Sequence, residues 1–265
     1  MWHTRGYMLV SNLLDDVWDE AEYAMREYFP SDHPGTLDFG GISFPTCSAL
    51  DKITLHKNIL KVARECIGQD IMLVQSEAWC KGELGENSDQ RMHMDFGNNS
   101  FTSPTWSNPE AVAAIVYFDD TRETGGATSV VPYTPTLYPF DAWKRMPGID
   151  LPFANNRVVA EYLMDVHGHG AFRRRLYDAE VNVRAKRGDV LFYRHDLWHR
   201  GTPVYPGRTR RVMNLVFKKT ECHHIYNWGH GFARGNYRGH VESVVRALSD
   251  DQRTVLGIPK GRCRL

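Results

Sequence analysis

The chain from residue 70 to residue 218 consists of short apolar runs separated by Gly, Pro, Asn and Asp, and this texture restricts the possible folds more than any other feature. Runs of this length between turn residues are typical of β-strands. Three turns are explicit, at residues 123–126, 186–189 and 205–207. We therefore expect a mainly β body, with strands at residues 71–79, 91–95, 111–118, 128–132, 181–184, 190–193 and 210–218.

The segments on either side of this body are predicted to be mostly helical. A short strand at 6–10 precedes a helix at 13–28, whose apolar residues recur at helical spacing. A second helix follows Ser48, where Asp51 completes a capping-box pattern, and ends at Gly68. A last helix is expected at 239–248. The chain is thus predicted to be one domain, residues 1–265, with an N-terminal helical elaboration (1–69), a β core (70–220) and a C-terminal loop and helix (221–265).

Composition indicates a globular protein without a strongly charged partner. Hydrophobic residues make up 42% and charged residues 24% of the chain, which excludes a disordered protein. Because 32 Lys and Arg balance 32 Asp and Glu, nothing in the bulk charge favours nucleic acid or a membrane surface as partner. The five cysteines show no Cys-x-x-Cys spacing and the N-terminus lacks a signal-like apolar run, so we expect reduced thiols and a cytoplasmic location.

A histidine and a carboxylate two residues apart, His93 and Asp95, lie in one of the expected strands. Residues i and i+2 of an extended chain project from the same face, so both side chains could bind one ion. Oxygen chemistry with ferrous iron requires a second imidazole, because two histidines and one carboxylate on one face leave positions open for a co-substrate and O2. The pattern therefore predicts a second histidine ligand far along the chain.

His199 is the candidate for that ligand, since it lies between the strands expected at 190–193 and 210–218. Arg210 stands at the head of the second of these strands, where its guanidinium could bind a carboxylate through two hydrogen bonds. Strand alternation places Arg210 and Arg211 on opposite faces. Only one of these two arginines can therefore face the metal.

These residues, in this order and strand context, closely resemble the phytanoyl-CoA dioxygenase family of Fe(II)- and 2-oxoglutarate-dependent oxygenases. The resemblance continues at residues 117–120, 124–128 and 186–192, and covers roughly residues 71–217. It implies a mainly β fold with flanking helices, the double-stranded β-helix (jelly roll, cupin-like). It also implies an oxidoreductase of the kind found in secondary metabolism, with a small-molecule substrate.

The resemblance further implies roles for individual residues. His93, Asp95 and His199 would bind Fe(II). Arg210 would bind the distal carboxylate of 2-oxoglutarate, with Gln75 and Thr202 as further contacts to this co-substrate. With O2 as the other co-substrate, the expected reaction is hydroxylation of an unactivated C–H bond, with release of succinate and CO2. The carboxylate at position 95 favours hydroxylation, because related halogenases lack it.

Two alternatives remain open. The first is a zinc-dependent hydrolase: His195 and His199 have the i, i+4 spacing of zinc ligands on a helix, although Asp196 replaces the usual Glu and glycines and prolines surround the segment. The other alternative is a barrel that binds a ligand without catalysis. In either case, the residues expected to line a substrate pocket are Phe96, Asn98, Tyr133, Trp198 and Trp228.

Overall fold

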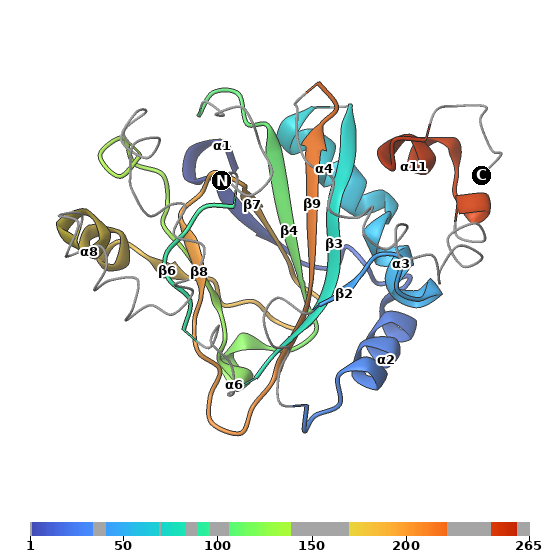
Figure 1. Cartoon of the computed structure of the whole chain (residues 1–265), viewed down its shortest axis with the longest axis horizontal. Helices are drawn as coiled ribbons and strands as arrows, with labels where there is room; N and C mark the ends of the chain where they lie inside the picture. The colour runs from blue at the N-terminus through green and yellow to red at the C-terminus, as the bar shows by residue number, and fades with distance from the viewer. Residues whose placement is uncertain are drawn as a thin grey trace.

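Two antiparallel β-sheets form the body of the protein in the computed structural model, which describes residues 2–33, 41–68, 70–82, 89–95, 106–138, 170–221 and 245–258. The larger sheet has the strand order β1-β7-β4-β9-β3-β2 and the smaller has the order β6-β5-β8 (Figure 1). The strands are β1 (Tyr7–Val10), β2 (Ile42–Ser43), β3 (Ile71–Lys81), β4 (Ala111–Tyr117), β5 (Thr128–Val130), β6 (Val181–Asn182), β7 (Val190–Arg194), β8 (His199–Gly201) and β9 (Arg210–Lys219).

Helices cover one face of the larger sheet. In α4, Ile59, Leu60 and Ala63 lie on one side of the helix and are buried in a core that includes Leu215 and Phe217 of β9. Figure 1 shows α2, α3, α4 and α11 together on this side of the sheet. The helices are α1 (Trp2–Arg5), α2 (Trp18–Tyr28), α3 (Ser48–Thr54), α4 (Lys57–Ile67), α6 (Thr121–Thr124), α8 (Gly170–Asp178) and α11 (Asp250–Val255).

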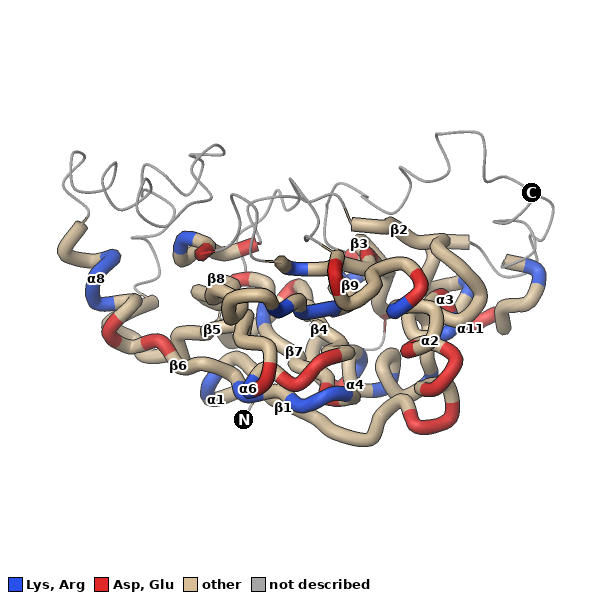
Figure 2. Tube along the Cα trace, turned by 90° about the horizontal axis from the view of Figure 1, so that it is seen from below, with Lys and Arg blue, Asp and Glu red and all other residues tan. Residues whose placement is uncertain are grey.

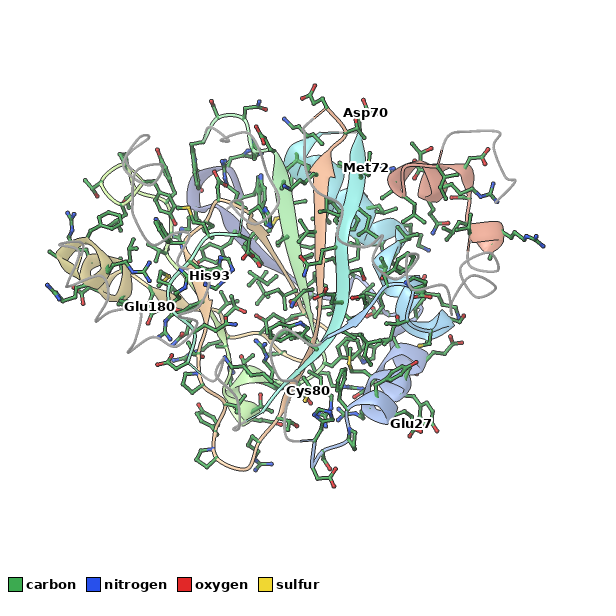
Figure 3. All side chains as sticks on the ribbon, in the orientation of Figure 1. Glu27, Asp70, Met72, Cys80, His93 and Glu180 are labelled. Carbon is green, nitrogen blue, oxygen red and sulfur yellow. The ribbon has the colours of Figure 1, made fainter. Side chains whose placement is uncertain are left out.

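The opposite face of the larger sheet turns toward the smaller sheet. Strand alternation in β4 sends Val112 and Ala114 to the helical side, whereas Ala113 and Ile115 belong to a second buried cluster between the sheets. His93 lies on this inner side and Glu27 on the helical side (Figure 3). The space that can hold a site therefore lies between the two sheets.

The described segments show neither a large patch of one charge nor a helix that could cross a membrane. Lysine, arginine and acidic residues are interspersed over the sheets and the flanking helices (Figure 2). Among the helices that the structure describes, none combines the length and the apolar character needed to cross a bilayer.

The mainly β fold with flanking helices is as predicted, but the helices differ in detail. The helix expected at 13–28 begins only at Trp18, because Asn12 takes a left-handed φ of +61° and residues 15–17 form a turn. The single helix expected after Ser48 is two helices. His56 separates them with an extended backbone, and its Nδ1 accepts a hydrogen bond from the Asn58 N–H at 3.3 Å, which caps α4.

The capping box expected at Ser48 does not form. Cys47 occupies the N-cap position of α3, and the Asp51 carboxylate instead accepts hydrogen bonds from the backbone N–H and the hydroxyl of Thr46, at 2.8 and 2.9 Å. Helix α11 was not predicted from the sequence, although its Ser249 and Gln252 do form a capping box. The helix expected at 239–248 lies mostly outside the described residues.

Candidate metal and co-substrate site

The first contact that builds the site is a backbone bridge between His93 and His199. Each residue donates its N–H to the carbonyl of the other at 2.9 Å, in antiparallel geometry. The strand expected at 91–95 is thus reduced to one bridge against β8, which is itself paired with β5 through His199 and Val130. This pairing brings together two histidines that lie more than a hundred residues apart in the sequence.

Both imidazoles are oriented by the same type of hydrogen bond. Nδ1 of His93 lies 2.8 Å from the Arg91 carbonyl, and Nδ1 of His199 lies 2.9 Å from the Leu197 carbonyl. A carbonyl can only accept, so each Nδ1 carries a proton, and in the neutral imidazole each Nε2 then presents a lone pair. This is the tautomer that a metal-binding histidine requires.

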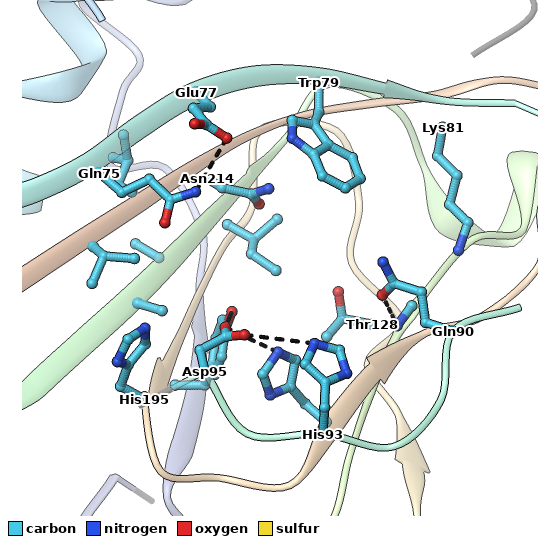
Figure 4. A pocket seen from close by; sticks show the side chains of 18 of the residues that line it. Gln75, Glu77, Trp79, Lys81, Gln90, His93, Asp95, Thr128, His195 and Asn214 are labelled. Atoms are coloured by element: carbon cyan, nitrogen blue, oxygen red, sulfur yellow. Dashed lines mark hydrogen bonds and ion pairs between the residues drawn. The ribbon is translucent and has the colours of Figure 1, made fainter. Parts of the chain in front are cut away.

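The Asp95 carboxylate faces both free nitrogens. Its two oxygens lie 3.5 Å from Nε2 of His93 and 3.2 Å from Nε2 of His199 (Figure 4). Three ligands at right angles and about 2.1 Å from one ion would be about 3 Å apart. Among the described residues, these three also form the one cluster of His, Cys, Asp or Glu able to hold a metal ion. The side chains fit a divalent metal of the two-histidine, one-carboxylate type.

The protonation states suit metal binding. Burial, with the neighbouring His199 adding to it, lowers the pKa of His93 to about 3. Burial would raise the pKa of Asp95, but His199 and His93 outweigh it and hold that pKa well below its usual range. Near neutral pH, His93 is therefore neutral and Asp95 ionised, which are the forms that bind a metal.

Two further contacts hold Asp95 in place. Its backbone N–H donates to the His195 carbonyl at 3.1 Å, and the Tyr193 hydroxyl donates to Oδ2 at 3.2 Å. Burial and the neighbouring Asp95 raise the pKa of Tyr193 well above its usual value, so this hydroxyl remains a donor. Tyr193 thereby fixes one carboxylate oxygen and leaves the other directed at His93.

A cavity of about 310 Å³ opens from these three side chains and extends along β3, β4 and β9. Gln75, Glu77, Trp79 and Lys81, at alternate positions of β3, all line it (Figure 4). A β-bulge between Leu73 and Gln75 determines which residues of β3 face the cavity. Upstream of the bulge, odd-numbered residues of β3 face the helices, and downstream they face the cavity.

One end of the cavity is cationic. Lys81 and Arg210 are directly paired across β3 and β9, and both side chains are 5% exposed. Nη1 of Arg210 donates to the Gly126 carbonyl at 2.7 Å, but Nε of Arg210 and Nζ of Lys81 receive no hydrogen bond partner from the described part of the chain. Burial, and then the charge of Arg210, lower the pKa of Lys81 well below its usual value of 10.5. Two buried basic side chains without an acidic partner among the described residues form a site for an anion.

Arg211 has the opposite orientation, as the alternation of β9 predicts. Its guanidinium pairs with Asp119 at 2.9 Å and donates to the Phe29 carbonyl at 2.5 Å, on the helical side of the sheet. Arg210 lines the cavity and Arg211 does not. Of the two guanidiniums, that of Arg210 therefore faces the cavity that the candidate metal ligands also line.

Of the two other residues expected to contact the co-substrate, Gln75 lines the cavity and Thr202 does not. Gln75 lines the cavity, but it lies six residues from Lys81 along β3, and its Nε2 donates to Glu77 at 3.1 Å. The Thr202 hydroxyl donates to the Ala127 carbonyl at 2.9 Å and is not among the groups that line the cavity. Gly201 lines it instead, and a Cβ at this position would lie 2.9 Å from Nζ of Lys81.

Of the aromatic residues expected in the substrate pocket, two are described and both pack elsewhere. Tyr133 stacks on Trp106 with ring centroids 3.7 Å apart. Trp198 is 1% exposed in the core, with its ring edge-on to Phe172. The other expected pocket residues, Phe96, Asn98 and Trp228, lie outside the described part of the chain.

The zinc alternative requires His195 and His199 on one helix, and the structure does not provide it. Residues 195–197 form a turn, and His199 belongs to β8. His195 lines the cavity without joining the cluster of metal ligands. The alternative fails because the segment is bent where its spacing would need a helix.

Sequence reasoning missed Lys81, Tyr193, Glu77 and Asn214. One signal was available: Gln75, Glu77 and Lys81 are polar residues at every second or fourth position of an otherwise apolar run. In a strand this spacing gathers polar groups on one face. The predicted strand ended at residue 79, however, which left Lys81 outside it.

The fold is similar to several solved structures. The non-heme α-ketoglutarate-dependent carbocyclase SnoK from nogalamycin biosynthesis is 15% identical with a TM-score of 0.60, covering 88% of this chain and 87% of its own. The epimerase SnoN from the same biosynthesis is 17% identical with a TM-score of 0.56 (87% and 84%). HygX from Streptomyces hygroscopicus, solved with nickel, 2-oxoglutarate and hygromycin B, is 15% identical with a TM-score of 0.52 (83% and 85%). These similarities confirm the jelly-roll architecture.

At the level of sequence, no curated protein matches the chain. The profile of the phytanoyl-CoA dioxygenase (PhyH) family matches residues 2–212, which include the three candidate metal ligands and Arg210. The match covers most of the chain. The protein belongs to the phytanoyl-CoA dioxygenase (PhyH) family.

Proposed function

We propose that the protein is an Fe(II)- and 2-oxoglutarate-dependent oxygenase that hydroxylates an unactivated C–H bond of a small organic molecule. The observation that carries the proposal is the pairing of two features in one cavity. His93, Asp95 and His199 converge on one face at one point, and the unneutralised cations of Arg210 and Lys81 face the same space. A co-substrate with one chelating end and one anionic end fits both features.

The cationic end supports 2-oxoglutarate as that co-substrate. A dicarboxylate bound through its keto acid at the metal would direct its second carboxylate toward Arg210 and Lys81. That carboxylate would replace the missing counterion of the two buried cations, which makes the interaction stronger than on a solvated surface. Gly201 contributes by leaving space beside Nζ of Lys81 that a Cβ would fill.

Ferrous iron, together with 2-oxoglutarate and O2, supplies the oxidising power that removes hydrogen from an unactivated C–H bond, with succinate and CO2 as by-products. The protein's own residues hold and orient the metal ligands and the co-substrate. The Arg91 and Leu197 carbonyls fix the imidazole tautomers, Tyr193 fixes the carboxylate of Asp95, and Arg210 sets the direction of the co-substrate.

Hydroxylation is the proposed outcome because Asp95 completes the ligand set. The Asp95 carboxylate would occupy the ligand position that the related halogenases leave to a halide. The structural neighbours include an epimerase and a carbocyclase from nogalamycin biosynthesis, and a protein solved with hygromycin B. Natural products of this size and polarity support a small organic substrate for the present chain.

The first test is the conversion of 2-oxoglutarate to succinate by purified protein with Fe(II) and O2. We expect slow, substrate-independent succinate formation that requires Fe(II), and that Asp95→Ala abolishes. Succinate formation that continues in Asp95→Ala, or that runs equally well without Fe(II), would contradict the proposal. Incorporation of one atom from 18O2 into a product then distinguishes hydroxylation from desaturation or ring closure.

A further inference from the structure

The end of the cavity remote from Arg210 carries a second polar group of side chains, made up of Gln75, Glu77 and Asn214. All three line the cavity and lie together above its apolar floor (Figure 4). Glu77 and Asn214 are directly paired across β3 and β9, just as Lys81 and Arg210 are. Of the three pairs between them, the middle one, Trp79 with Val212, lies on the same face of the sheet. The cavity thus has a cationic end, an apolar middle and an acidic end.

The separation of the two ends follows from strand geometry. Glu77 and Lys81 are four residues apart on β3, which corresponds to about 13 Å along the strand. The co-substrate, held at one end by Arg210 and at the other by the metal ligands, has both carboxylates engaged. A carboxylate at Glu77 would repel it. The acidic end is therefore available to the substrate and is unfavourable for 2-oxoglutarate.

The atoms that remain free to form hydrogen bonds at this end of the cavity are mostly acceptor oxygens. Oε2 of Glu77 accepts from Nε2 of Gln75 at 3.1 Å, and Oε1 accepts a long hydrogen bond from the Ser43 hydroxyl at 3.4 Å. No lysine or arginine of the described segments lies within 4.0 Å of Glu77. Since Gln75 uses its amide N–H toward Glu77, its carbonyl oxygen is left to accept. The Asn214 side chain has no hydrogen bond to another described residue, and its amide can donate or accept.

We propose that this acidic end, formed by Glu77, Gln75 and Asn214, recognises a protonated amine of the substrate. A carboxylate partly removed from water, without a cationic partner in the described segments, gains most from a ligand that brings both a positive charge and N–H donors. An ammonium group supplies both, and neighbouring hydroxyls can bond to the amides of Gln75 and Asn214. The Trp79 indole provides the apolar surface for the carbon skeleton. This inference rests on the proposed function, because it takes the metal and 2-oxoglutarate sites as given.

The test uses the full chain loaded with Fe(II) and 2-oxoglutarate without oxygen, so that binding is measured without turnover. The probes are two sets that share a skeleton and differ in one group: glucosamine, glucose and glucuronate, and cyclohexylamine, cyclohexanol and cyclohexanecarboxylate. Dissociation constants come from ligand-observed NMR. In at least one set we expect the amine to bind about tenfold or more tightly than its neutral and acidic counterparts.

Variants identify the group responsible. Glu77→Gln, which keeps shape and removes charge, should abolish the preference for the amine, whereas Asn214→Asp, which adds a carboxylate, should strengthen it. Glu65→Gln, an equivalent change at an exposed position on α4, should leave the preference unchanged. Absence of any amine preference in the wild type, or its persistence in Glu77→Gln, overturns the inference.

Binding of 2-oxoglutarate separates failure of this inference from failure of the proposed function. Glu77→Gln should bind 2-oxoglutarate as the wild type does, because the carboxylate lies at the far end of the cavity. If the wild type binds 2-oxoglutarate but shows no preference for amines, only the proposed role of the acidic end is refuted. Loss of 2-oxoglutarate binding in the wild type would refute the oxygenase itself.

Discussion

Replacing Arg210 and Arg211 one at a time should separate co-substrate affinity from stability. Both guanidiniums are buried, but they face opposite sides of β9. Truncating one partner of a buried charge pair costs about 2–5 kcal/mol of binding free energy. Lys81 remains beside the co-substrate in Arg210→Met, so the lower part of this range applies. We expect a loss of about 2–3 kcal/mol in 2-oxoglutarate binding, or roughly 30- to 150-fold in the dissociation constant.

Arg211→Met should act on the fold instead. It leaves the Asp119 carboxylate buried without its guanidinium, and breaking a buried pair costs about 3–5 kcal/mol of unfolding free energy. The Arg211 backbone N–H still donates to Asp119, and Arg26 remains 3.8 Å away, so about 3 kcal/mol is expected. For a chain of this length, that loss lowers Tm by roughly 6–12 °C. Affinity for 2-oxoglutarate should stay within about twofold of the wild type.

The assay pairs anaerobic calorimetry of 2-oxoglutarate binding to the metal-loaded protein with thermal unfolding of the same preparations. Arg210→Met should lose affinity and keep its Tm, since removal of one of two adjacent buried cations relieves repulsion in the unliganded protein. Arg211→Met should show the reverse. If Arg211→Met loses more affinity than Arg210→Met, the register of β9 and the assignment of the cationic end are both wrong.

Three further outcomes test the rest of the site. Fe(II) should raise the Tm of the wild type but not that of Asp95→Ala, whose far-ultraviolet circular dichroism should be unchanged; an equal rise in both would place the metal elsewhere. Tyr193→Phe, which removes the hydrogen bond to Asp95, should weaken Fe(II) binding by about 10- to 100-fold, and unaltered affinity in a metal titration would show that the bond does not hold the ligand. Because burial and Arg210 lower the pKa of Lys81 in the folded chain, the unfolded chain binds more protons in the window below 10.5, so unfolding free energy should rise with pH there. Urea unfolding across that window should show a smaller rise in Lys81→Met; an equal rise would assign the effect to another group.

The order and spacing of a few residues predict candidate ligands that the structure then brings close together. His93 and Asp95, two apart, and a histidine followed by an arginine at the head of a strand are local patterns, and strand alternation alone separates Arg210 from Arg211. The mainly β body was equally readable from its turn residues. These features depend on neighbours in the sequence, and the structure brings the three ligands within 4.8 Å of one another.

The cavity wall depended on tertiary structure. The bulge between Leu73 and Gln75 shifts the alternation of β3 by one residue and turns Gln75, Glu77 and Lys81 inward. Pairing with β9 then sets Lys81 against Arg210 and Glu77 against Asn214. A one-residue slip would exchange the faces of the strand. The spacing of Gln75, Glu77 and Lys81 indicates that they share a face, but it does not show which residues of β9 lie opposite them. The register is set by the partner strand and by the helices packed on the other face.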